Sequence, residues 1–95
     1  FQLDVADQQR VWQESTALAQ LLNEGFGADK MNIGALGNVV SQLHVHVIVR
    51  KRDDAAWPAP VWGKHPAKPY SDEQVAVIRA RLREILPADF TFLEA

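Results

Sequence analysis

The stretch "SQLHVHVIV", residues 41–49, decides the fold, because it is the strongest strand signal in the chain and carries two of its three histidines. Its valines and isoleucine, uninterrupted by glycine or proline, predict a strand over residues 42–50. Side chains alternate across a strand, about 6.5–7 Å apart on one face. One face then carries Gln42, His44, His46 and Ile48. The opposite, apolar face carries Leu43, Val45 and Val47, and we expect it to turn toward the core.

Three interpretations of the paired histidines are open on this strand alone. The sheet could simply have a solvated face on which both imidazoles lie. Histidines two residues apart on a strand could instead share a tetrahedral Zn²⁺, with His65 or a carboxylate as a third ligand. In the third interpretation one neutral imidazole is a nucleophile or base and its neighbour stabilises or donates.

Length and composition indicate one small domain. The chain has 95 residues, a net charge of −2 and no cysteine. A chain of this size buries only about 60–65% of its surface, so a partner subunit would add stability. The scattered charges argue against a nucleic-acid binder, and no apolar run is long enough for a membrane span. We therefore expect a soluble cytoplasmic protein that binds neither nucleic acid nor membrane.

Two amphipathic helices flank the strands. The first is expected over residues 7–24, capped by Asp4 or Asp7 and ended by Gly25 and Gly27. Its apolar positions are Val11, Trp12, Leu18, Ala19, Leu21 and Leu22. The second is expected to begin at the capping-box pair Ser71 and Gln74 and to end before Pro87. Its apolar face carries Val75, Ile78, Leu82 and Ile85.

A second strand is expected over residues 30–35. The stretch "GALGNVVS", residues 34–41, joins or ends this strand, and its two glycines indicate a turn or a close backbone approach. The stretch "WPAPVWGKHPAKPY", residues 57–70, contains too many prolines for a helix or a central strand. We expect it to form an extended, ordered loop.

Small and amide residues lie just before the histidine strand: Asn32, Gly34, Gly37 and Asn38. Bare backbone and short amides are suited to cradling an anion such as phosphate. Beside two histidines, they favour phosphate chemistry.

These residues resemble the histidine-triad (HIT) family, whose signature is His-x-His-x-His-x-x with apolar x. Here "QLHVHVI", residues 42–48, matches six of those seven places. Asn32 and the pair Gly37-Asn38 lie about where the family carries its nucleotide-contacting Asn and Gly-Gln. The tail "RDDAAWPAPVWG", residues 52–63, resembles a bacterial branch labelled as dinucleoside polyphosphate hydrolases.

The resemblance implies an α+β fold over residues 1–95, a single domain with a HIT-like antiparallel sheet, one long packed helix and a second C-terminal helix. Family members usually begin with further strands that hold the base and ribose. The chain therefore resembles the C-terminal two-thirds of a member, without the N-terminal strands. A homodimer through the first helix and the adjoining sheet edge is expected.

The resemblance implies a nucleotide hydrolase or nucleotidyl transferase acting at the α-phosphate through a phosphohistidine. His44 would be the nucleophile, His46 the phosphate contact, and the carbonyl of Gln42 would orient the nucleophile. The implied substrate contacts, to an adenine nucleotide, are Asn32, Gly37, Asn38 and Ser41. No metal or other cofactor is needed by this mechanism, although a polyphosphate could arrive with Mg²⁺.

Two departures from the family pattern favour an alternative, a non-catalytic nucleotide-binding or interaction module of the same fold. Gln42 replaces the first histidine of the triad. Val39 stands where many members carry a hydroxyl, although Ser41 lies close by.

Residues outside the signature favour structural roles. We expect the loop aromatics Trp57 and Trp62 to pack rather than to stack on a base. We expect the strand-end charges Arg50 and Arg52 to be exposed rather than to meet phosphate, Asp53 and Asp54 to begin a turn, and His65 to be solvated.

Overall fold

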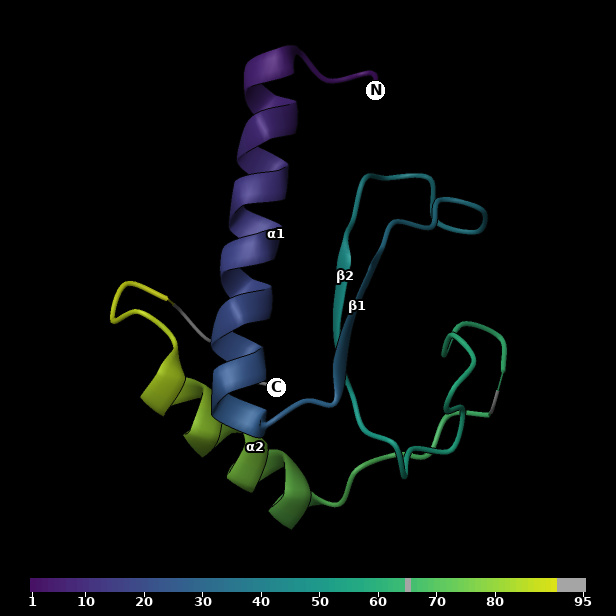
Figure 1. Ribbon diagram of the computed structural model, residues 1–95, viewed down its shortest axis with the longest axis vertical. Helices are drawn as coiled ribbons and strands as arrows, with labels where there is room; N and C mark the ends of the chain where they lie inside the picture. The colour runs from purple at the N-terminus through teal and green to yellow at the C-terminus, as the bar shows by residue number, and fades with distance from the viewer. Residues whose placement is uncertain (65, 91–95) are drawn as a thin grey trace.

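The computed structural model describes residues 1–64 and 66–90, which form two helices and two strands in the order α1, β1, β2, α2. Strands β1 (Lys30–Gly34) and β2 (His46–Arg50) form a two-stranded antiparallel sheet. Helix α1 runs along one side of this sheet, and the chain after β2 folds back on the other side (Figure 1). The expected α+β architecture is confirmed.

Helix α1 (Val5–Phe26) has the expected cap at Asp4, and it begins two residues earlier and ends two residues later than expected. The Asp7 amide donates to the Asp4 carboxylate at 2.8 Å, which satisfies one of the free N–H groups of the first turn. Gly27 ends the helix in a left-handed conformation with φ 60°, which glycine adopts without steric cost. The expectation that Gly25 also stops the helix is wrong, because Gly25 lies inside the last turn and serves there as a contact.

Helix α2 (Asp72–Ile85) begins with the expected capping box between Ser71 and Gln74, with both reciprocal hydrogen bonds present. It crosses the C-terminal end of α1 (Figure 1). The two helices meet where Ile85 lies on Gly25, so closely that a Cβ there would be 2.5 Å from the Ile85 side chain. Arg81 Nε adds a hydrogen bond of 2.8 Å to the Gly25 carbonyl.

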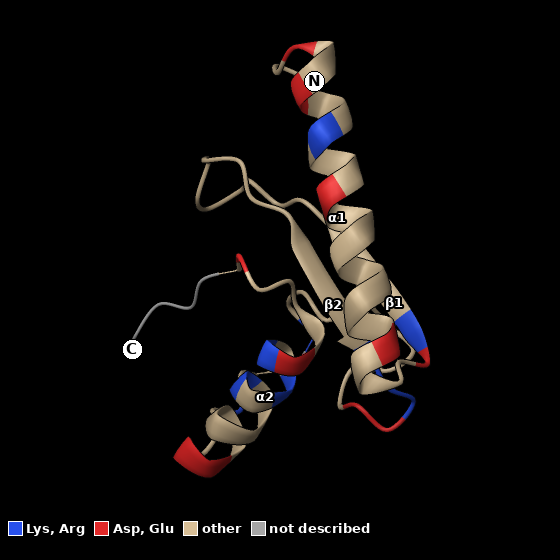
Figure 2. Cartoon of the chain, turned by 90° about the vertical axis from the view of Figure 1, so that its left-hand side faces the viewer, with Lys and Arg blue, Asp and Glu red and all other residues tan. Residues whose placement is uncertain are grey.

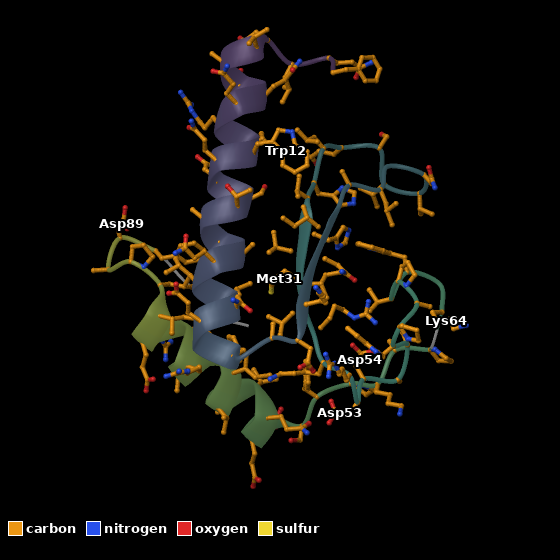
Figure 3. All side chains as sticks on the ribbon, viewed as in Figure 1. Trp12, Met31, Asp53, Asp54, Lys64 and Asp89 are labelled. Carbon is orange, nitrogen blue, oxygen red and sulfur yellow. The ribbon has the colours of Figure 1, made fainter. Side chains whose placement is uncertain are left out.

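The register of the sheet fixes its two faces. Met31 pairs with Val49 and Ile33 with Val47, and Met31 points toward α1 (Figure 3). On the other face Asn32 pairs with Ile48, and Gly34 with His46. This agrees with the predicted alternation, in which the valines face the core and the histidine face turns away from it.

The histidine strand is shorter than predicted. Pairing ends at Gly34 and His46, so residues 42–45 lie outside β2 and His44 precedes the strand. Of these residues only Val45 is β-branched, and β1 offers no further partner beyond Gly34.

The tail after β2 begins with the turn that we expected at Asp53 and Asp54, and turns continue through residues 57–64, which we expected to be extended. Backbone hydrogen bonds close successive turns, from Asp54 N to Lys51 O, from Trp57 N to Asp54 O and from Ala59 N to Ala56 O. Lys51 Nζ donates to the carbonyls of Phe26 and Gly27, each at 2.6 Å, and so caps the C-terminal end of α1. The tail is thereby tied to α1 as well as to the sheet.

Burial is sparse. In the described part of the chain the only buried hydrophobic residue is Ala56, whereas Trp12 is 61% exposed and Val5 68% exposed. Trp12 therefore contributes less to the packed face of α1 than we expected. Neither of the two described helices combines the length and the apolar character needed to cross a membrane.

Candidate functional site

His44 is held by the backbone two residues before it. Its Nδ1 lies 2.7 Å from the carbonyl oxygen of Gln42. A carbonyl oxygen can only accept, so Nδ1 carries the proton and donates it. In the neutral ring the unprotonated nitrogen is then Nε2, whose lone pair is free for attack or for accepting a proton.

The ring of His46 lies against that of His44. Their centroids are 5.1 Å apart with an interplanar angle of 75°, with His44 in the loop and His46 at the first position of β2. Both rings are half-buried. Of these two adjacent imidazoles, His44 lines the hollow described below.

The ring of Trp62 packs against the ring of His46. The Trp62 and His46 rings make an edge-to-face contact with centroids 5.7 Å apart and an angle of 82°. Trp62 also lies on the bare backbone of Gly34, where a Cβ would come within 2.7 Å of its ring. The tail and β1 therefore meet beside the histidine pair, and Trp62 has the packing role that we expected.

His44 opens into a hollow of about 430 Å³ at the end of the hairpin. The polar part of its wall comes from Gln2 and from the loop between the strands: Gly37, Ser41, Gln42 and His44. Its apolar part comes from the first residues of the chain and from the same loop: Phe1, Leu3, Ala35, Leu36 and Leu43. Three of the expected site residues, Gly37, Ser41 and Gln42, thus line the same hollow as the imidazole of His44, the expected nucleophile.

Asn32 does not reach this hollow. Its side-chain oxygen accepts a hydrogen bond of 2.6 Å from Arg50 Nη1, and its amide nitrogen donates to the Met31 carbonyl at 3.1 Å. Asn38 is exposed and is not part of the wall of the hollow. Their role as substrate contacts stays a prediction, and for Asn32 it would require the amide to leave Arg50.

Arg50 is the residue that the sequence interpretation missed. We expected it to be exposed, but it is only 2% exposed. Its guanidinium pairs with both carboxylate oxygens of Asp54, at 2.8 and 3.1 Å, and donates to the carbonyl of Ala59 at 2.8 Å. It also lies 5.4 Å from the centroid of the Trp57 ring. Arg52, in contrast, is exposed as expected.

We call the set of Asn32, Arg50, Asp54 and Ala59 the arginine clamp. It joins β1, β2 and the tail through a single planar cation, which suits the fixed fork of a guanidinium. The Arg50 partner lowers the pKa of Asp54 far below its usual range, with further lowering by the backbone amides of Lys51, Trp57 and Ala56 against the opposing effect of burial. The same hydrogen bond raises the pKa of Arg50.

The surroundings of the histidine pair are uncharged. Lys and Arg, Asp and Glu are gathered on the helices and around the turn after β2, while the upper part of the sheet and the loop above it carry none (Figure 2). No carboxylate of residues 31–49 is therefore present to repel an approaching anion. Asp54, Asp53 and Lys64 lie on the tail side of the sheet (Figure 3).

No group of three or more His, Asp or Glu side chains among residues 1–64 and 66–90 is arranged to hold a metal ion. His65, the third histidine of the zinc interpretation, lies outside the described residues. The expectation that His65 is solvated therefore stays a prediction.

Comparison with known proteins agrees with this geometry. The family model described as the HIT domain matches residues 1–53, more than half of the chain. Curated protein sequences offer no significant match.

Solved structures of three bacterial histidine triad proteins resemble this chain closely. The one from Sinorhizobium meliloti 1021 is 46% identical with a TM-score of 0.82 and is covered over 64% of its length by 90% of this chain. The protein from Marinobacter aquaeolei VT8 is 53% identical with a TM-score of 0.81, and 90% of this chain covers 62% of its length. The protein from Bradyrhizobium japonicum is 41% identical with a TM-score of 0.80, and 87% of this chain covers 62% of its length. The chain thus spans less than two thirds of the length of these proteins.

The family match takes in α1, both strands and the histidine pair, while the structural matches extend the likeness over most of the remaining chain. With an imidazole fixed by the preceding backbone and a second imidazole beside it, this chain belongs to the histidine triad, or HIT, domain family.

Proposed function

We propose that the site acts on nucleotides at the α-phosphate, as a nucleotide hydrolase or nucleotidyl transferase, with His44 as the nucleophile. The single observation that carries the proposal is the hydrogen bond from His44 Nδ1 to the Gln42 carbonyl, at 2.7 Å. It fixes the tautomer in which Nε2 has a free lone pair, and it orients the ring without the help of a side chain at position 42.

The reaction would have two steps. In the first, His44 Nε2 bonds to the α-phosphorus and the bond from phosphorus to the leaving group breaks; the leaving group keeps the electron pair and takes a proton from solvent. In the second, water attacks the same phosphorus and loses a proton to solvent, and the P–N bond breaks, which returns the electron pair to Nε2. His46, with its ring 5.1 Å away, would donate to the phosphoryl oxygens as charge develops on them.

The proposal also covers what the nucleotide is and how the protein is assembled. Resemblance of the tail to the dinucleoside polyphosphate hydrolase branch supports a phosphoric anhydride or phosphoramidate substrate with adenine as the base. The base and ribose would be held by a part of the protein that corresponds to the unmatched third of the solved relatives, and a homodimer in the cytoplasm would be the working form. The loop residues Gly37, Ser41 and Gln42 would contact the phosphate.

The test is release of AMP from diadenosine tetraphosphate and from adenosine phosphoramidate. His44→Ala should abolish turnover, and mass spectrometry of the parent stopped during turnover should locate an acid-labile adenylyl group on His44. Val77→Ala, which changes an exposed residue of α2, is the matched control. Equal AMP release by the parent and by His44→Ala would exclude this function.

The second candidate is a nucleotide-binding module without turnover. Replacement of the first triad histidine by Gln42 and the dominance of apolar side chains in the wall of the hollow favour it. It predicts that the parent binds AMP but releases none from either substrate.

A further inference from the structure

His46 is held differently from His44. The His44 ring has a hydrogen bond to the backbone, whereas His46 makes no ring hydrogen bond with any residue in the described part of the chain. Its ring is held by contacts with two other rings, those of His44 and Trp62. Because the Trp62 contact is the one that comes from outside the histidine segment, it decides how freely the His46 ring can turn.

Trp62 in turn rests on a position that only glycine can occupy at this distance. A Cβ at Gly34 would be 2.7 Å from one ring atom of Trp62 and 3.0 Å from the next. Gly34 is the register partner of His46 across the sheet, so the indole covers both residues of the last pair. The φ of Gly34 is not positive, so the absence of a side chain matters here rather than backbone freedom.

The arginine clamp anchors the tail that carries Trp62. Arg50 is in β2, Asn32 in β1, and the Asp54 carboxylate and Ala59 carbonyl belong to the tail. Arg50 and His46 are four residues apart on β2, so their side chains lie on the same face of the sheet. Asn32, which pairs with Ile48, lies on that face as well. The tail therefore leaves the clamp on the same side as the histidine and returns with Trp62 above it.

We propose that Trp62 is a positioning residue, which rests on Gly34 and holds the His46 imidazole in the orientation that contacts the phosphate. The clamp keeps the tail in register with the sheet, so that the indole returns to the same place. This proposal rests on the proposed function, because it assigns to His46 a phosphate to contact.

Nuclear magnetic resonance of the full chain can test it through the ring signals of His46, with AMP as the probe. In the parent we expect cross-relaxation between the Trp62 and His46 ring protons, and AMP should shift the His46 signals. Trp62→Ala should weaken AMP binding about tenfold, the loss expected for one misplaced hydrogen bond to a charged phosphate. Trp62→Phe, which keeps an aromatic edge, should restore most of the affinity.

A double-mutant cycle separates positioning from a general loss of structure. Gly34→Ala should weaken AMP binding when Trp62 is present, because the new methyl group displaces the indole. In a Trp62→Ala background, Gly34→Ala should weaken AMP binding little further, because the space that the indole occupied is then empty. Where the parent turns over a dinucleoside polyphosphate, Trp62→Ala should lower kcat/KM about tenfold or more.

The outcomes separate this proposal from the proposed function. Parent-like AMP binding and unchanged His46 signals in Trp62→Ala would overturn the positioning role, even if the parent hydrolyses its substrate. Additive effects of the two substitutions would overturn it as well. AMP binding that depends on Trp62 in a parent without turnover would support positioning and exclude only the hydrolase. A parent whose His46 signals do not respond to AMP would overturn the positioning role, whether or not that parent releases AMP from its substrates.

Discussion

At the scale of single residues, the site uses backbone where the family pattern would suggest side chains. The first triad position holds Gln42, but the group that fixes His44 is the carbonyl oxygen of that residue. Every amino acid supplies a carbonyl, so the substitution leaves the tautomer of His44 unchanged. The identity of the side chain at position 42 then matters much less than that of the imidazoles.

Gln42→Ala should therefore keep turnover within about fivefold of the parent, because a neutral contact of this kind contributes about 1 kcal/mol. The measurement is the rate of AMP release, with the ¹⁵N shifts of the His44 ring as a structural readout. A change in the His44 tautomer in this variant would contradict the backbone account.

Asp54 makes the stability of the folded chain depend on pH. Its pKa in the folded chain is lowered, mainly by the hydrogen bond to Arg50. A carboxyl whose folded pKa lies below its unfolded value of about 3.9 adds stability above that value, and the stability is lost as the pH falls through the folded pKa. The clamp should thus be at full strength at neutral pH and weaken in acid.

Asp54→Asn should unfold at lower urea concentration than the parent at pH 7, and the gap should narrow as the pH is lowered below about 4. Urea titrations between pH 7 and pH 3 measure this. Asp53→Asn, at the exposed neighbouring position, is the control and should track the parent. If the urea concentrations at which the parent and Asp54→Asn unfold differed by the same amount at every pH, the charge of Asp54 would not contribute to stability.

At the scale of the elements, helix ends are satisfied by two kinds of partner. The N-terminal caps of both helices are local, each made by a side chain three residues from the amide that it accepts. The C-terminal end of α1 is capped from elsewhere, by Lys51 from the tail and Arg81 from α2. These cations join α1 to the segments that cover the rest of the molecule and offset the partial negative charge of its last carbonyls.

Ser71→Ala should destabilise the chain by about 1 kcal/mol, because it removes the acceptor of the Gln74 amide. Thr16→Ala is a matched control, since that hydroxyl donates back to the Trp12 carbonyl within the helix, where such a bond adds little. Thermal and urea unfolding of both variants provide the comparison. Equal losses would mean that α2 does not depend on its cap.

Lys51→Met should cost about 1 kcal/mol, because two carbonyls at the end of α1 lose their donor. Lys30→Met, at an exposed position of β1, is the control for the removal of a positive charge. Hydrogen exchange should locate the loss in the last turn of α1, and unchanged protection there would contradict the capping role.

At the scale of the whole molecule, polar ties rather than a large apolar core connect the segments. Within the described residues Ala56 is the only buried hydrophobic side chain, while the arginine clamp is fully buried at its centre. Several large apolar side chains of α1 and of the loop between the strands stay exposed, among them Val5, Trp12, Val39 and Leu43. Exposed apolar surface of this kind is typical of chains that associate.

Association through α1 should make apparent stability depend on protein concentration. We expect the melting temperature to rise with concentration and Trp12→Glu to remove that dependence, because it places a charge on the apolar part of α1. Sedimentation equilibrium gives the mass directly. A monomer at every concentration, with a constant melting temperature, would contradict the expected homodimer.

Much of the local structure could be predicted from the sequence. Three correct predictions depend on residues close together in the chain. They are the capping box at Ser71, the glycine end of α1 at Gly27, and the alternation that places His46 and Val47 on different faces of the sheet. The HIT signature likewise lies within one short segment. The failures concern partners far away in the sequence, as for Gly25, which lies inside the helix against Ile85.

The sequence by itself determined where helices begin, which strand residues share a face and which two imidazoles stand together, because these depend on backbone periodicity and on neighbours within a few residues. Only the tertiary structure decided that β2 starts at His46, that Arg50 rather than Arg52 is buried, and that Trp62 lies on Gly34. A strand lasts only as long as its partner, and a cation can be buried only where acceptors from several segments converge. Those conditions are met in three dimensions and leave no local pattern in the sequence.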